Sequence, residues 1–329
     1  MIKLFSKKKE TKTEKNFYSK TLVISERHLG DYIFQNITRL FAFFVFGLIV
    51  LIFLEMFIES LPSINKFGLS FITSSHWDPV KDKYGALPFI FGTLYSSLLA
   101  LIIALPLSIG VAVFLTEVAP DWLEQPISLL VELLAAIPSI VYGLFGIFVL
   151  APFLRIVVEP FLKTHFGFLP FFKGDMFGFG MLAAALILSI MIIPIITSIS
   201  RDVMKAIPDS LREGAYALGA TKWETIKIVL ISARSGILGA TLLGFGRAIG
   251  ETMAVTMVIG NKPEISFSLF DAGHTMASVL ANEFTEAASD LYISSLIEIG
   301  LLLFVITIVI NSIARVVVNR VTKKYGKIN

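Results

Sequence analysis

Six long apolar segments constrain the fold of this 329-residue chain more than any other feature. Each is long enough to cross the hydrocarbon core of a bilayer, which takes roughly 20 helical residues. They lie near residues 37–58, 89–115, 137–154, 181–199, 235–259 and 293–318. The third segment is the hardest to delimit, because Pro138 and Pro152 interrupt it. We therefore predict an all-α integral membrane protein with six transmembrane helices.

The composition supports a membrane protein and excludes several other classes. Hydrophobic residues make up 55% of the chain and charged residues 16%, whereas a soluble domain carries about 25% charged residues. The net charge of +3 is too small to indicate a nucleic-acid partner. The absence of cysteine excludes a disulfide framework, a cysteine-ligated zinc and thiol catalysis.

The basic residues predict the orientation in the membrane. Lys and Arg gather in the N-terminal tail (residues 1–35), in the loop before the fifth segment (200–233) and in the C-terminal tail (321–329). With six spans these three regions fall on one side, so the positive-inside rule places both termini in the cytoplasm. We expect one transmembrane domain, residues 36–320, in a bacterial or archaeal cytoplasmic membrane. Residues 122–136 are amphipathic and predict a helix on the cytoplasmic surface that turns into the third span at Pro138.

The loop before the fifth segment holds the signals of a short helix. Asp209 or Ser210, after Pro208, can cap a helix start. Gly219 stands where a C-terminal cap needs a positive φ angle. Thr221 and Glu224 then have capping-box spacing, which predicts a second helix that continues into the fifth span. The first helix has only two to three turns, so packing must stabilise it.

This short helix carries a pattern that resembles the EAA motif of ABC importer permeases. Its apolar residues Leu211, Ala215 and Leu218 recur on one face, so it lies either on its own protein or lipid or in a groove of a partner. Glu213-Gly214-Ala215 is followed after three residues by Gly219, as in the motif, although Gly214 replaces the first alanine. The usual ending Ile-x-Leu-Pro is also absent, since residues 229–232 read Val-Leu-Ile-Ser. The resemblance implies a coupling helix that docks onto a nucleotide-binding subunit through the following residues: Leu211, Glu213, Gly214, Ala215, Leu218 and Gly219.

The fifth segment contains a charge pair where a plain membrane helix would be apolar. Arg247 lies about a dozen residues into the segment, near the middle of the hydrocarbon core, where a charge costs on the order of 3 kcal/mol. Glu251 follows four residues later, on the same helical face, and can neutralise it. Gly246 and Gly250 have GxxxG spacing, which favours close helix packing.

Two interpretations of Arg247 and Glu251 remain open at this point. The pair can be a structural ion pair that makes the arginine tolerable in lipid. Alternatively it handles an anion, because a guanidinium offers paired donors that match phosphate oxygens. In that case Glu251 holds Arg247 at rest and is displaced or protonated as the anion passes.

Three stretches extend the resemblance to a particular group of importers. The sequences GRAIGETMAVTMVIGN (246–261), ELLAAIPSIVYG (132–143) and NSIARVVV (311–318) resemble PstC-type subunits of phosphate-specific ABC importer permeases. The similarity extends from about residue 85 to the C-terminus. It implies a MetI-like fold, inorganic phosphate as the substrate, and essential roles for Arg247 and Glu251 in its passage. It also implies a companion PstA-type permease, a PstB-type ATPase dimer and a PstS-type phosphate-binding protein.

Nothing in the sequence indicates an enzyme. There is no Walker motif or nucleophile–base spacing, and His28, His76, His165 and His274 form no metal-ligand cluster. We therefore expect this chain to bind no cofactor, with ATP and magnesium held by the partner ATPase. Three alternatives remain: an oxyanion transporter driven by an ion gradient, a structural membrane scaffold, and the companion PstA-type subunit, which shares the IGET core.

Overall fold

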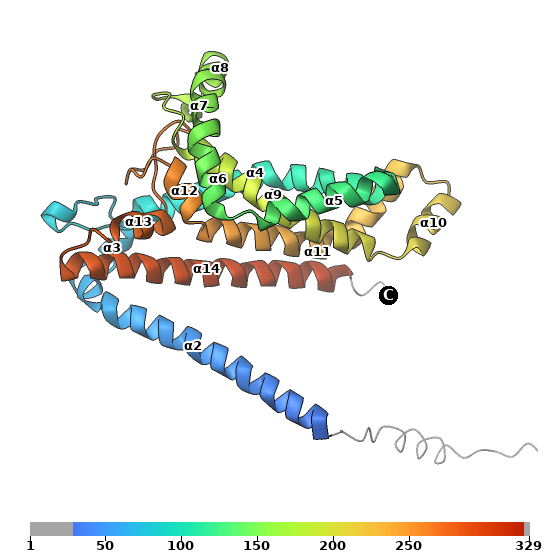
Figure 1. The fold of residues 1–329 in the computed structure, drawn as a ribbon, viewed down its shortest axis with the longest axis horizontal. Helices are drawn as coiled ribbons and strands as arrows, with labels where there is room; N and C mark the ends of the chain where they lie inside the picture. The colour runs from blue at the N-terminus through green and yellow to red at the C-terminus, as the bar shows by residue number, and fades with distance from the viewer. Residues whose placement is uncertain (1–28, 326–329) are drawn as a thin grey trace, which may run out of the picture. The chain divides into compact units, whose positions relative to one another are not determined.

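The computed structural model describes residues 29–325 of the chain (Figure 1). Most of the predicted N-terminal tail and the last four residues of the C-terminal tail lie outside this range. Residues 29–35 and 321–325, predicted as parts of the tails, belong to the first and last helices. Regular structure in the described residues is helical, apart from a β-bridge between Asp78 and Lys83.

All six predicted apolar segments are confirmed as helices with the length and hydropathy of membrane spans. They are α2 (Leu29–Phe67), α4 (Leu87–Val113) with η2 (Phe114–Val118), the run from α6 to α8 (Ser139–Phe166), α9 (Met181–Lys205), α11 (Lys222–Gly250) and α14 (Asp290–Tyr325). The run from α6 to α8 comprises α6 (Ser139–Phe145), η3 (Gly146–Leu150), α7 (Ala151–Phe153), η4 (Leu154–Val158) and α8 (Glu159–Phe166). The shorter elements are α3 (Ser70–Thr73), η1 (Pro79–Lys81), α5 (Asp121–Ala136), η5 (Pro170–Phe172), α10 (Asp209–Ala217), α12 (Met253–Val258) and α13 (Met276–Glu283).

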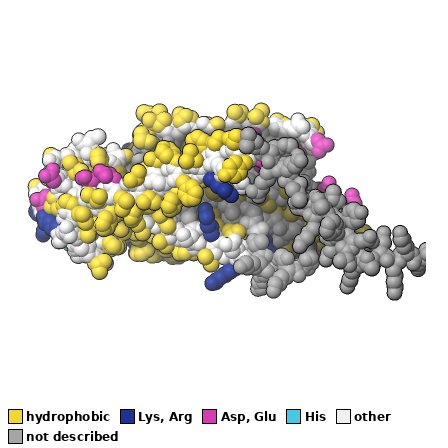
Figure 2. All heavy atoms as spheres, turned by 90° about the horizontal axis from the view of Figure 1, so that it is seen from below, with side chains coloured by type: hydrophobic (Ala, Val, Ile, Leu, Met, Phe, Trp, Pro, Cys, Tyr) yellow, Lys and Arg dark blue, Asp and Glu magenta, His cyan; other side chains and the backbone are white. Residues whose placement is uncertain are grey.

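The chain divides into two compact units, Met1–Glu55 and Met56–Asn329, with the boundary inside α2. The described part of the first unit is the N-terminal stretch of α2, an apolar helix. Every other helix, and every candidate site described below, belongs to the second unit. Hydrophobic side chains cover most of the visible described surface, as expected where the surroundings are lipid (Figure 2).

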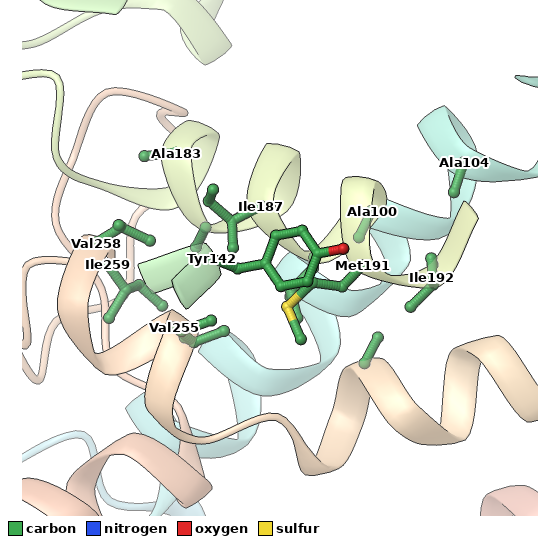
Figure 3. Packing of buried hydrophobic residues seen from close by; sticks show 14 of the residues in the cluster. Ala100, Ala104, Tyr142, Ala183, Ile187, Met191, Ile192, Val255, Val258 and Ile259 are labelled. Carbon is green, nitrogen blue, oxygen red and sulfur yellow. The ribbon is translucent and has the colours of Figure 1, made fainter. Parts of the chain in front are cut away.

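The core of the second unit is formed mainly by α4, α6, α9, α11 and α12. Figure 3 shows how Ala100 of α4, Ile187 and Met191 of α9, and Val255 of α12 pack around Tyr142 of α6. Small residues allow the close approach: a Cβ atom added at Gly244 of α11 would lie 2.7 Å from the Ile196 side chain. Because lipid offers no hydrophobic drive between helices, close packing of this kind stabilises the bundle.

The helix α5 differs from its prediction as a cytoplasmic surface helix. Figure 1 shows it running alongside α9, and acidic residues on α5 pair with basic residues at the end of α9. Glu124 pairs with Lys205, and Glu132 accepts from Arg201 at 3.1 Å. These ion pairs and the packing on α9 account for the difference. The predicted break at Pro138 is confirmed, since α6 begins directly after it.

The loop between α2 and α4 is anchored to the start of α14 by aromatic residues. Trp77 packs edge-on against Tyr84 and Tyr292. Glu283 accepts hydrogen bonds from Trp77 Nε1 at 2.8 Å and from the Tyr292 hydroxyl at 2.6 Å. Burial of the Tyr84 hydroxyl raises its pKa to about 12. This loop is therefore an ordered connection, which joins the beginning of α4 to the beginning of α14.

Candidate functional site

The fifth membrane helix ends much earlier than the apolar pattern predicts. The predicted span covers residues 235–259, whereas α11 runs from Lys222 to Gly250. Glu251 has an extended backbone (φ −71°, ψ 126°), and a separate helix, α12, begins at Met253. The Glu251 carboxylate accepts a hydrogen bond from the Ala254 amide at 3.4 Å, which satisfies one free N–H group at the start of α12. Hydropathy does not reveal the break, because α12 is apolar as well.

Arg247 consequently lies in the last turn of α11 and not within a continuous helix. Gly244, three residues earlier, lies against Ile192 and Ile196, near the midpoint of α9 (Met181–Lys205). This packing agrees with the predicted depth of Arg247 near the middle of the bundle. The negative end of the α11 dipole also favours a cation there, by about 0.3–1 kcal/mol.

The predicted pairing of Arg247 with Glu251 is not formed within the described part of the chain. The Arg247 side chain is exposed, whereas Glu251 is only 8% exposed and faces the start of α12. The four-residue spacing brings two side chains together only where the helix continues, and α11 has ended before Glu251. In the described structure Arg247 is thus a membrane arginine without an acidic partner.

The GxxxG pair beside Arg247 is open in this chain. No atom lies within 4 Å of a Cβ atom added at Gly250, and only Asn311 Oδ1, at 3.7 Å, approaches one added at Gly246. The close helix approach that this spacing predicts is therefore not made inside the described structure. The glycines leave the face of α11 next to Arg247 free.

A second helix break lies next to the first. The chain leaves α5 at Ala136 and starts α6 at Ser139, and Gly143 of α6 packs against Ala254 and Met257 around α12. Broken helices that meet inside a membrane bundle commonly line ion sites, because their free ends provide partial charges. The third and fifth membrane segments thus present their breaks to one another.

Tyr142 bridges the second break, a role that sequence reasoning did not single out. Its hydroxyl donates to the Leu134 carbonyl at 2.7 Å, across the break between α5 and α6. The ring is 6% exposed and packs beside Met191 (Figure 3). The only sequence signal was its position four residues after Pro138.

The predicted short helix before the fifth span is confirmed as α10, with corrections at its start. It covers Asp209–Ala217 and ends at Gly219, whose φ of 82° is the positive value predicted for the cap. The capping box at Thr221 and Glu224 is also present. Pro208 is the N-cap and makes no side-chain cap, so the prediction of an Asp209 or Ser210 cap is wrong. The Asp209 carboxylate instead accepts from Arg212 at 3.1 Å.

The apolar residues of α10 do not form one buried face. Ala215 is 7% exposed and packs on its own chain, whereas Leu211 is 38% and Leu218 is 91% exposed. The remaining predicted coupling residues, Glu213, Gly214 and Gly219, are exposed as well. Leu211 and Leu218, together with the nearby exposed Tyr216 and Trp223, leave an apolar surface with no partner in the described chain.

Arg212 attaches α10 to the membrane helices, a role that sequence reasoning missed. Its Nη2 donates to Glu117 of η2, the element that follows α4, at 2.9 Å and to the Met204 carbonyl of α9 at 3.1 Å. Its Nη1 donates to the Ile207 carbonyl at 2.8 Å. The bond to the Glu117 carboxylate raises the pKa of Arg212 above its ordinary value. A displacement of α10 would therefore pull on α4 and α9 as well as on α11. No cluster that could hold a metal ion occurs among the described residues.

Similar proteins agree on the family. Residues 104–323 match the family described as binding-protein-dependent transport system inner membrane component. Proteins called "phosphate transport system permease protein PstC" are similar over most of their length: 48% identity in Mesorhizobium japonicum (91% of this chain, 93% of the relative) and 47% in Haemophilus influenzae (90% and 95%). A "probable" PstC of Methanocaldococcus jannaschii is 39% identical (85% and 91%).

The fold has a solved relative. An inward-facing structure of the MetNI methionine ABC transporter superposes with a TM-score of 0.54 at 19% identity, covering 71% of this chain and 94% of that one. At this identity the likeness concerns the fold alone, and it confirms the predicted MetI-like architecture. The chain therefore belongs to the binding-protein-dependent transport system inner membrane components and, within them, to the PstC-type permeases.

Proposed function

We propose that this chain is the transmembrane permease subunit of an ATP-driven importer that moves inorganic phosphate into the cytoplasm. The observation that carries the proposal is the 48% identity over 91% of the chain with a protein called a phosphate transport system permease. The structure supports it with an unpaired arginine at a helix break in the membrane and with an exposed apolar surface on α10.

Arg247 is the residue that handles the anion. A planar guanidinium binds phosphate oxygens through two parallel N–H···O bonds, which are strong where water is excluded. Because Arg247 has no acidic partner in the described chain, its donors are available to an anion or to the companion subunit. Glu251 is part of the same pathway through its position: it shapes the break that exposes the last turn of α11.

The helix α10 couples this pathway to the ATPase. Leu211 and Leu218 offer the exposed apolar side chains that a groove on the ATPase would bury. Glu213, Gly214, Ala215 and Gly219 complete the docking surface. Motion of α10 then reaches α11 through the Thr221 turn and reaches α4 and α9 through Arg212.

The remaining subunits follow from this role. We propose a companion PstA-type permease, a PstB-type ATPase dimer that binds ATP and magnesium, and a PstS-type phosphate-binding protein outside. The chain itself catalyses no hydrolysis and binds no cofactor. It spans a bacterial or archaeal cytoplasmic membrane with both termini inside, since Arg201, Lys205 and Arg212 gather at the α10 end of the bundle.

The alternatives have less support. A transporter driven by an ion gradient does not need the exposed surface of α10, and a structural scaffold does not need an unpaired membrane arginine. The relatives reported above are named as PstC and not as the companion subunit.

Reconstitution tests the proposal. The chain would be purified together with the candidate companion permease, ATPase and binding protein and placed in vesicles. We expect ATP hydrolysis stimulated by phosphate, accompanied by phosphate uptake, and lost when any one component is omitted. Uptake that continues without the ATPase, or that resists vanadate, would favour the gradient-driven alternative.

A further inference from the structure

A groove of about 780 Å³ runs between α11 and α14. On α11 it is lined by Gly239, Leu242, Leu243 and Gly246, and on α14 by Thr307, Asn311, Ala314, Arg315, Val318 and Asn319. Its volume lies within the range of about 300–1,000 Å³ that is typical of small-ligand sites. The groove lies entirely within the second unit of the chain.

The α14 side of the groove is a polar stripe on an otherwise apolar helix. Thr307, Asn311, Arg315 and Asn319 follow one another at four-residue intervals, which corresponds to about 18 Å along the axis. The Thr307 hydroxyl donates to the Leu303 carbonyl at 2.7 Å and is satisfied within the helix. The other three side chains are exposed and have no side-chain hydrogen bond or ion pair within the described residues.

The charge of the groove is positive. Arg315 contributes a full positive charge, the two asparagine amides contribute N–H donors, and the described lining contains no Asp or Glu. An arginine at this position needs a partner that can accept several hydrogen bonds. Carboxylate and phosphate oxygens match a guanidinium best, and the lining itself provides neither.

The position of the groove connects it to Arg247. On α11, the end of the groove farther from α10 is at Gly246, the neighbour of Arg247. A Cβ atom added at Gly246 would lie 3.7 Å from Asn311 Oδ1. From there the groove runs past Arg315 and Gly239 toward the α10 end of the bundle, where α11 begins (Figure 1). An anion that leaves Arg247 toward that end would meet Asn311 first, then Arg315 and Asn319.

We propose that Asn311, Arg315 and Asn319 form a second oxyanion site, which takes the transported phosphate from Arg247 on its way to the cytoplasm. The inference rests on the proposed function and adds residues to its pathway. Two weak sites in series favour flux, because each holds the ion briefly and neither becomes a trap. A phospholipid headgroup presents the same phosphate chemistry, so the experiment must separate the two sources.

The test uses the complete importer in vesicles, with Arg315→Gln, Arg315→Lys and the control Arg320→Gln. Arg320 is an exposed arginine on the same helix that does not line the groove. We expect Arg315→Gln to lower the maximal rate of phosphate uptake about tenfold, the effect of one charge-assisted hydrogen bond, while KM, assembly and basal ATP hydrolysis stay unchanged. Arg315→Lys should recover most of the rate, and Arg320→Gln should transport like the wild type.

A direct readout uses the absence of cysteine from this chain. Asn319→Cys would be labelled by a thiol reagent in complexes whose other subunits are cysteine-free. Inorganic phosphate should slow the labelling when Arg315 is present and have no effect in the Arg315→Gln background.

Four outcomes would overturn the site. If Arg315→Gln takes up phosphate normally while Arg247→Ala does not, the second site is refuted and the proposed function stays intact. Loss of assembly in Arg315→Gln would show that the groove holds a helix of another subunit. An Arg315 effect that appears only in vesicles with phosphatidylglycerol, and not in pure phosphatidylcholine, would assign the groove to lipid. A wild-type complex that imports no phosphate would refute the proposed function and this inference with it.

Discussion

Arg212 at the α10 end of the bundle and Arg247 within the bundle differ in how their charges are paired. Arg212 donates to the carboxylates of Glu117 and Asp209 and to two backbone carbonyls. Arg247 makes no ion pair with any described residue, and its side chain is exposed. In a protein that works without other subunits we would expect the arginine within the membrane to be the paired one. An unpaired charge costs more free energy in hydrocarbon than near water.

The difference indicates which parts of the chain are complete on their own. The α10 end of the bundle pairs its charges internally and leaves apolar side chains exposed, which is the composition of a docking surface. The membrane break leaves the charge of Arg247 without an acidic partner in the described chain, which is the composition of a site for a polar ligand. The missing partner of Arg247 must therefore come from another subunit or from the substrate.

The largest expected effect tests the free charge directly. Arg247→Ala should lower phosphate uptake by about a hundredfold or more, because it removes donors that act in a site shielded from water. Assembly and basal ATP hydrolysis should stay near wild-type values, since Arg247 makes no ion pair in the described chain. Uptake in vesicles measures the first quantity and co-purification the second. A variant that transports normally would remove Arg247 from the pathway.

The second prediction tests the free apolar side chain at the other end. Leu218→Asp should weaken binding of the ATPase about tenfold or more, because a central apolar contact becomes a buried charge. The folding of the chain should not change, since Leu218 is 91% exposed. Leu69→Asp, at a leucine that is 83% exposed and lies far from α10 in the loop after α2, is the matched control. Equal binding by both variants would place the ATPase elsewhere.

The two regions also differ in how much the sequence could predict. The helix α10, its glycine cap and the Thr221 capping box follow from local rules, in which neighbouring residues determine the backbone, and all three are confirmed. The six membrane segments follow from hydropathy for the same reason. The roles of the coupling residues and of Arg247 stay predictions.

The break after Gly250 could not be predicted in this way. It depends on a hydrogen bond from Ala254 to Glu251 and on packing against α6, and both hold apolar residues in place without changing the hydropathy. The clamp between Arg212 and Glu117 joins residues 95 positions apart, a distance at which one sequence without relatives gives no signal. Contacts between residues far apart in the sequence thus determine the helix break and the ion pair, which local sequence patterns do not predict.

The third prediction tests whether the charges at the α10 end of the bundle are satisfied within the chain, as their contacts indicate. Arg212→Met should lower the stability of the chain by about 2–3 kcal/mol, because it leaves the Glu117 carboxylate, 8% exposed, without its partner. Adding Glu117→Leu should recover part of the loss. Thermal unfolding in detergent measures both. Lys81→Met, which breaks an exposed pair with Asp78, should lower the stability much less, because solvent screens that pair. Equal losses from the two pairs would contradict the clamp.

The smallest effect decides what Glu251 does at the membrane break. If its carboxylate acts as a cap for α12, Glu251→Gln should keep nearly full stability and transport, because the amide oxygen can still accept from Ala254. Glu251→Ala should lose about 1 kcal/mol, the usual cost of a missing cap, and transport more slowly as the break loses its shape. If Glu251 instead neutralises Arg247 in the assembled importer, Gln and Ala should reduce uptake equally while Gln leaves stability unchanged. Melting temperature and uptake rate, measured on both variants, separate a residue that positions the arginine from one that balances its charge.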